Sequence, residues 1–191
     1  MTWNQGADQF LTALSSSDPT PGGGAAAAMA GAMGCALTLM AIGTSLKRKS
    51  TPITHQVPLQ KAQQTFSQYK DEMEQCMAQD AQAYNNYISA YRLPKEDSAR
   101  PEALQNALWE AALVPANAAT LCTRILQEIS LVQPFIAPII LSDVYCAQHL
   151  LKGALACCVE NIRVNLEGIT SQERREKLNK QLTTFITVLN K

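Results

Sequence analysis

The sequence predicts an all-α protein: a single-domain helical bundle over residues 1–191, organised around one helix of small residues. Three observations support this prediction. Long segments place apolar residues at spacings of three and four, proline and glycine gather at a few breaks, and residues 25–36 are mostly alanine and glycine. Small side chains let helices pack closely, so we expect the helix Pro21–Leu46 to lie buried in the centre of the bundle.

The composition excludes several classes of protein. Only 17% of the residues are charged and the formal net charge is +0, whereas a nucleic-acid-binding protein would show a basic excess. Six cysteines fall inside predicted helices without a CxxC pair, and the chain has only two histidines. We therefore expect a cytoplasmic protein without a disulfide framework or a metal centre.

The segment Pro21–Leu46 carries no charge and is long enough to cross a bilayer. It consists mainly of alanine and glycine, however, with Thr38, Thr44 and Ser45 and few large aliphatic residues. This composition favours a buried helix in a bundle over a membrane span.

The start of this helix has an unusual composition. Thr20 suits the capping position, Pro21 suits the first helical position, and Gly22, Gly23 and Gly24 follow. Each glycine costs about 1 kcal/mol relative to alanine inside a helix, which indicates that some group approaches this backbone closely. The free N–H groups of a first helical turn favour a carboxylate or a developing negative charge. The alternative is that the glycines only allow close helix packing or form a loose loop.

The remaining helices follow from the same patterns. Three helices are expected over residues 4–14, Leu59–Leu93 and Pro101–Leu131, the last with a kink at Pro115. A further helix begins with Ser142 as its cap and Asp143 in its first turn. The terminal helix begins with a capping box at Thr170–Glu173 and runs to Lys191. Thr51-Pro52 and Pro58 mark breaks, and residues 132–141 form an apolar connector.

Asp80 interrupts the apolar stripe of the helix Leu59–Leu93, one turn from both Cys76 and Tyr84. A carboxylate at such a position loses hydration, so its pKa should rise unless a partner holds the charge. Such a group is suited to proton transfer or to holding a cationic substrate. The alternative is an aspartate that bonds to a neighbouring helix or lies at the edge of the stripe, and spacing alone does not decide between these interpretations.

Asn161 and Asn165 lie on an otherwise apolar seam and must find hydrogen-bond partners on another helix, on a substrate or across a dimer interface. Together with small residues on several faces, they favour a homodimer. Arg48 and Lys49 end the small-residue helix; they form either a site for an anionic ligand tail or a solvated helix end.

Several of these stretches together resemble the cyclodeaminase/cyclohydrolase family, whose members act on one-carbon units carried by tetrahydrofolate. The matching stretches are PTPGGG with the Ala/Gly-rich run and the basic pair, DAQAY at Asp80–Tyr84, YRLPK at Tyr91–Lys95, Val114-Pro115 and NIRVNL at Asn161–Leu166. The chain departs from many members at Ile136-Ala137, where they carry Gly-Asn before the Ser-Asp pair; this departure would reshape the pocket.

The resemblance implies Asp80 as the acid/base residue of a folate-derivative enzyme that needs no cofactor. The reaction is hydrolysis of 5,10-methenyltetrahydrofolate to 10-formyltetrahydrofolate or cyclodeamination of 5-formiminotetrahydrofolate, and the absence of a formiminotransferase domain favours the first. An enzyme of another amidine or imine ring, or a non-catalytic helical homodimer, is the alternative. The expected substrate-binding residues are Thr20, Pro21, Gly22, Gly23, Gly24, Arg48, Lys49, Ser142, Asp143, Asn161 and Asn165.

Overall fold

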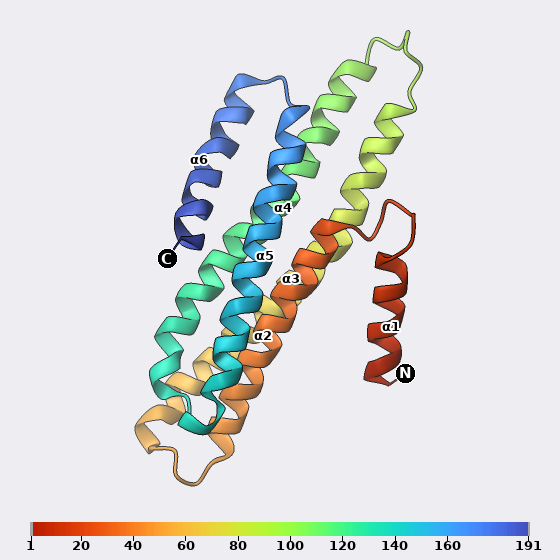
Figure 1. Ribbon diagram of the computed structural model, residues 1–191. Coiled ribbons are helices and arrows are strands. Elements are labelled where there is room, and N and C mark those ends of the chain that lie inside the picture. Colours follow the sequence, from red (N-terminus) through yellow and green to blue (C-terminus); the bar gives the residue numbers. More distant parts are fainter. Residues whose placement is uncertain (1, 191) are drawn as a thin grey trace.

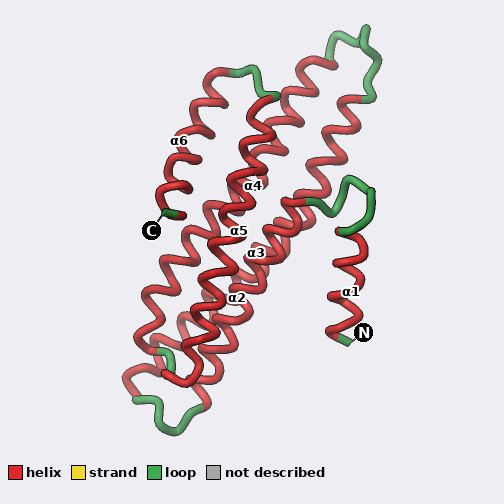
Figure 2. The backbone as a smooth tube through the Cα atoms, in the orientation of Figure 1, coloured by secondary structure: helices red, strands yellow, loops and turns green. Residues whose placement is uncertain are grey.

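The computed structural model describes residues 2–190, and across these residues it contains helices and no strand (Figure 1, Figure 2). The prediction of an all-α fold is confirmed. The α-helices are α1 (Trp3–Leu14), α2 (Gly23–Lys47), α3 (Ile53–Tyr91), α4 (Arg100–Val132), α5 (Leu141–Glu167) and α6 (Gln172–Leu189). Two 3-10 turns, η1 (Gln133–Phe135) and η2 (Pro138–Ile140), replace the expected irregular connector.

Helices α2 to α5 form the four-helix core. Each of α2 and α4 packs against both α3 and α5, while α6 covers α4 and α5. Helix α1 stands apart from this bundle (Figure 1), and Leu11 on its expected apolar side is 61% exposed. The amphipathic helix predicted for residues 4–14 therefore exists, but its own chain leaves much of its apolar side uncovered.

The small residues of α2 bring its neighbours close, as predicted. A Cβ atom on Gly31 would lie 2.8 Å from Met73 Sδ of α3, and one on Gly34 would lie 2.8 Å from Leu151 Cγ of α5. Helix α2 is long and apolar enough to cross a membrane, yet 56% of its most apolar 18-residue stretch is buried in the bundle. Its outer face remains open, with Met33 and Met40 half exposed, so the helix is less enclosed than expected.

Several helix starts differ from the predictions. Helix α2 begins at Gly23 with Gly22 as its cap, because the backbone is still extended at Gly22. Helix α3 begins at Ile53 and includes Pro58, which deprives only the exposed carbonyl of Thr54 of its helical partner.

The caps of the last two helices also lie elsewhere. Turn η2 leads directly into α5, so Ile140 is the cap and Ser142 is already helical. Ser171, rather than Thr170, caps α6 by accepting a hydrogen bond from the Arg174 N–H. Thr170 instead donates its N–H to Gln105 Oε1 over 2.9 Å.

Pro115 and Asn165 form a linked pair between α4 and α5. Pro115 has no N–H, so the Ala111 carbonyl one turn earlier lacks its helical donor. Asn165 supplies that donor from α5, with its Nδ2 3.1 Å from the Ala111 oxygen, and it also donates to the Asn161 carbonyl at 3.0 Å. This seam asparagine thus bonds to a neighbouring helix of its own chain.

We predict that Asn165→Ala lowers the free energy of unfolding by about 1 kcal/mol in the natural chain, because the Ala111 carbonyl loses its donor. The same substitution should cost less in a Pro115→Ala background, where the restored backbone N–H can reach that carbonyl. Chemical denaturation of the four proteins of this double-mutant cycle measures the coupling. Equal costs in the two backgrounds would disprove the link.

Candidate functional site

A cleft of about 520 Å³ lies at the N-terminal end of α2. Its lining comes from the α1–α2 loop, from α3, α4 and α5, and from the start of the α5–α6 loop. The fold thereby brings together several residues that the sequence analysis had singled out. These are Thr20, Gly22, Gly23, Gly24, Asp80, Asn161 and Asn165, with Pro21 in the same loop.

The Asp80 side chain extends from α3 onto the first turn of α2. The Ala25 N–H donates a hydrogen bond to Asp80 Oδ2 over 3.1 Å. A Cβ atom on Gly24 would lie only 2.6 Å from Asp80 Cγ, so a larger residue at position 24 would displace the carboxyl group. The close approach expected at the glycines is therefore made by the protein's own carboxylate, at the positive end of the helix dipole.

The surroundings of Asp80 alter its acidity. Burial raises the pKa of its carboxyl group above the ordinary value of 3.8, and the hydrogen bond from Ala25 opposes this rise only in part. No lysine or arginine within residues 2–190 forms an ion pair with Asp80. The carboxyl is thus partly desolvated and free of a cationic partner, as suits a group that accepts and returns a proton.

Asn161 lies beside Gly23 and keeps one polar atom available. Its Nδ2 donates to the Cys157 carbonyl over 2.8 Å, which holds the side chain along its own helix. A Cβ atom on Gly23 would lie 3.3 Å from that nitrogen. Its oxygen Oδ1 accepts no hydrogen bond from the described part of the chain, so a ligand N–H or O–H can use it.

The cleft also has apolar walls that the sequence analysis did not assign to a site. Tyr84 and Tyr87 of α3 and Leu108 of α4 line it. The signal was present in the spacing, because Tyr84 and Tyr87 follow Asp80 by four and seven residues and so share its face of the helix.

The other expected binding residues lie at the opposite end of the bundle. Gly24 lies in the first turn of α2 and Arg48 caps its C-terminal end, so the two are about 36 Å apart along the helix at a rise of 1.5 Å per residue. Ser142 and Asp143 lie at that end too, because the adjoining η2 segment contacts α2 there through the Ala137 N–H, 2.9 Å from Ser45 Oγ. Within one chain, these residues and Asp80 cannot contact the same small ligand.

The departure at Ile136-Ala137 belongs to this distant end as well. Ile136 is 5% exposed and joins the hydrophobic core, while Ala137 bonds to Ser45. The expectation that this pair reshapes the pocket is therefore wrong for the cleft around Asp80 in a single chain, because neither residue lines it.

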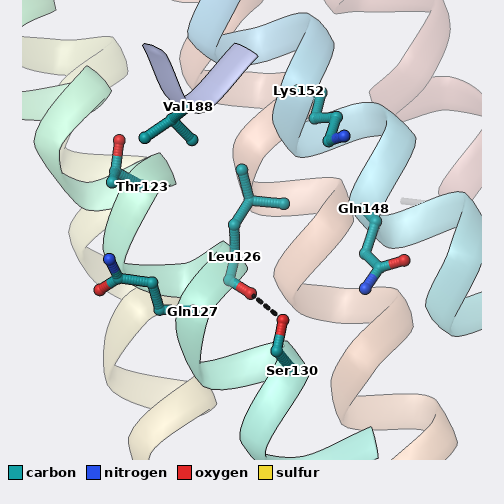
Figure 3. Close-up of a pocket in the computed structure, with 7 residues that line it drawn as sticks. All are labelled: Thr123, Leu126, Gln127, Ser130, Gln148, Lys152 and Val188. Atoms are coloured by element: carbon teal, nitrogen blue, oxygen red, sulfur yellow. Dashed lines mark hydrogen bonds between the residues drawn. The ribbon is translucent and has the colours of Figure 1, made fainter. Parts of the chain in front are cut away.

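A second cavity, of about 320 Å³, lies between α4, α5 and α6 (Figure 3). Lys152 is the charged residue among those that line it, and the Ser130 hydroxyl donates a hydrogen bond to the Leu126 carbonyl over 3.1 Å. It lacks a carboxylate, a thiol or an imidazole, so it offers no group for proton transfer at neutral pH. Among the described residues, no cluster of His, Cys, Asp or Glu has the arrangement of a metal site.

We predict a pH-dependent difference in stability between the natural protein and Asp80→Asn. The unfolded chain releases the Asp80 proton near the ordinary pKa of 3.8, whereas the folded protein holds it to higher pH. The folded state therefore binds more protons in this window, and stability falls as pH rises through it. The unfolding free energy of the variant should rise relative to the natural protein from pH 3.5 upward, as measured by urea denaturation. A pH-independent difference would refute the raised pKa.

Comparisons with known proteins agree with the fold. The family model described as formiminotransferase-cyclodeaminase matches residues 6–184. A methenyltetrahydrofolate cyclohydrolase of Methylorubrum extorquens is 30% identical over 186 residues, covering 95% of this chain and 89% of the relative. A formimidoyltransferase-cyclodeaminase of Gallus gallus is 26% identical, and the match covers 93% of this chain and 33% of that longer protein.

A solved structure shows the same fold. The crystal structure of formiminotetrahydrofolate cyclodeaminase from Thermotoga maritima superimposes with a TM-score of 0.84 at 23% identity, covering 100% of this chain and 90% of the other. The match of the family model over nearly the whole chain, together with the 30% identical relative, shows that the protein belongs to the formiminotransferase-cyclodeaminase family.

Proposed function

We propose that this protein hydrolyses 5,10-methenyltetrahydrofolate to 10-formyltetrahydrofolate. The observation that carries the proposal is the Asp80 carboxyl, which is partly desolvated, has a raised pKa and lies in a cleft at the N-terminus of α2. The cyclohydrolase of Methylorubrum extorquens supports this choice, because the alignment spans 89% of that relative.

The chemistry requires a base that then acts as an acid. The methenyl carbon bridges N5 and N10 of the folate as an amidinium-like cation, which a nearby carboxylate stabilises. Water adds to this carbon while Asp80 takes a proton from the water molecule, which gives a tetrahedral adduct. Asp80 then returns the proton to N5 as the bond between the carbon and N5 breaks. The hydroxyl of the adduct releases its proton to solvent as the formyl C=O forms, and the formyl group stays on N10.

The rest of the cleft fits a flat, polar ring system. Gly22, Gly23 and Gly24 present bare backbone, so a planar ring can approach closely. Tyr84 and Tyr87 supply an aromatic wall, and Asn161 Oδ1 can accept a hydrogen bond from a ring N–H or from the attacking water.

The same carboxyl would also serve the cyclodeaminase reaction, which is the second candidate. There N10 attacks the carbon of the formimino group held on N5, and a proton delivered to the departing imino nitrogen releases ammonia. The names of the chicken and Thermotoga maritima relatives favour this candidate. A different cyclic amidine as substrate, or a non-catalytic bundle, would leave the protein inactive on both folates.

We predict that Asp80→Asn slows turnover by roughly a hundredfold or more, the usual scale for the loss of general acid–base assistance. The amide keeps the shape of the carboxyl and its oxygen can still accept the Ala25 N–H, so the variant should remain folded. The measurement is the decay of methenyltetrahydrofolate absorbance, with release of ammonia from formiminotetrahydrofolate as a parallel assay and a melting curve for each protein.

Asp71→Asn is the matched control, because Asp71 is an exposed aspartate on the same helix that faces Lys70 in an ion pair at 2.9 Å. It should retain natural turnover. An Asp80→Asn protein that is fully active would remove this residue from catalysis. A natural protein that is inactive on both folates would overturn the proposed activity.

We further propose that the protein is a homodimer joined through the outer face of α2. No charged residue occurs from Gly23 to Leu46, and Met33 and Met40 are 50% and 44% exposed on this face. A Cβ atom on Gly43 would meet no atom of the described chain within 4 Å, so packing within one chain does not explain the glycine at this position. A face without charges can meet its own copy without burying an unpaired ion.

An antiparallel pairing of two α2 helices would have a consequence for the site. It would bring Arg48 and Lys49 of one copy toward the N-terminal end of α2 in the other. The two groups of expected binding residues, which one chain holds apart, would then approach each other across the twofold axis.

We predict a dimer by light scattering at micromolar concentration, and a monomer for Met33→Glu, because a carboxylate would be buried in the interface. Leu131→Glu is the control: Leu131 is 67% exposed on α4, where it lines a groove shared with α3, and its replacement should leave the dimer intact. A natural protein that scatters as a monomer would exclude the dimer, and dissociation by Leu131→Glu alone would place the interface elsewhere.

A further inference from the structure

The Asp80 cleft continues along one face of α3 as a row of tyrosines. Asp80, Tyr84, Tyr87 and Tyr91 follow one another at spacings of four, three and four, so their side chains share a face of the helix. Tyr84 and Tyr87 line the cleft, and the Tyr91 ring lies 6.1 Å from the Tyr87 ring. The row extends about 16 Å from Asp80 at the rise of an α-helix.

The row ends at an arginine. The Arg100 guanidinium lies over the Tyr91 ring, 5.5 Å from its centre, and its Nη2 donates to the Tyr91 carbonyl over 3.2 Å. These two contacts hold the cation at the tip of the α3–α4 hairpin, which projects beyond the rest of the bundle (Figure 1).

The charge of Arg100 is not neutralised by its own chain. Within residues 2–190, no carboxylate forms an ion pair with it, and its buried Nε has no hydrogen-bond partner. A planar guanidinium in this state suits a carboxylate ligand, which it can bind through two parallel hydrogen bonds.

We propose that this row is the binding path for the p-aminobenzoyl and glutamyl part of the folate, with Arg100 holding a carboxylate of a polyglutamate tail. The inference rests on the proposed function. With the one-carbon unit at Asp80, the aromatic ring of the substrate lies along Tyr84 and Tyr87, and the tail passes Tyr91 to reach Arg100. This path lies within one chain, whereas Arg48 and Lys49 would reach the tail only from a second copy.

Binding of an unreactive folate tests this path independently of turnover. The probes are 5-methyltetrahydrofolate with one and with three glutamyl residues, titrated by calorimetry against the natural protein and Arg100→Gln. We expect the natural protein to prefer the triglutamate, and Arg100→Gln to bind the triglutamate roughly fivefold more weakly with little change for the monoglutamate. With triglutamyl methenyltetrahydrofolate as substrate, Arg100→Gln should raise KM, whereas Asp80→Asn should lower kcat, which separates the two roles.

The double variant Arg48→Gln/Lys49→Gln is the matched comparison, and a melting curve for each protein controls for folding. If it abolishes the preference for the triglutamate while Arg100→Gln keeps it, the tail binds at a second copy and the inference is wrong. An active natural protein with equal affinities for the two probes would also overturn the inference and leave the activity standing. A natural protein that neither binds nor converts a folate would overturn the proposed function, and the inference with it.

Discussion

The contact between the Asp80 carboxyl and the first turn of α2 is the interaction on which the site depends. It requires a glycine at position 24, because a Cβ atom there would overlap the carboxyl, and it gives Asp80 one hydrogen bond from the Ala25 N–H. The contact also desolvates the carboxyl, and burial raises its pKa. The one contact thus fixes the position of the Asp80 carboxyl, raises its pKa and leaves bare backbone beside it, which are the features on which the proposed proton transfer rests.

The bundle around this contact is arranged to hold it firmly. Gly31 and Gly34 bring α3 and α5 against α2, so the two helices that carry Asp80 and Asn161 meet at the same helix terminus. Asn165 joins α5 to α4 by serving the carbonyl that Pro115 leaves without a donor. Residues that are unfavourable inside a helix thus serve contacts between helices here: Gly31 and Gly34 admit side chains of α3 and α5, and Asn165 compensates for Pro115.

Much of this could be predicted from local sequence, because a helix fixes which residues share a face. The spacing identified Asp80 on an apolar stripe, and the glycines indicated a close approach to their backbone. The spacing did not identify what approaches, since that depends on how α3 crosses α2. Arg48, Ser142 and Asp143 lie apart from Asp80 within one chain, because the length of α2 separates its ends by about 36 Å. Local sequence does not show whether a second copy brings the two groups together. The caps at Thr20 and Ser142 failed because an extended loop and a 3-10 turn override local preference.

The central claim is that the reacting end of a folate binds beside Asp80 rather than at the end of the bundle that holds Arg48 and Ser142. A crystal structure of the protein with bound 5-methyltetrahydrofolate tests this most directly. The account predicts the pterin over Gly22–Gly24, with N5 near the Asp80 carboxyl. A pterin bound between Arg48 and Ser142 of the same chain, with the Asp80 cleft empty, would contradict it.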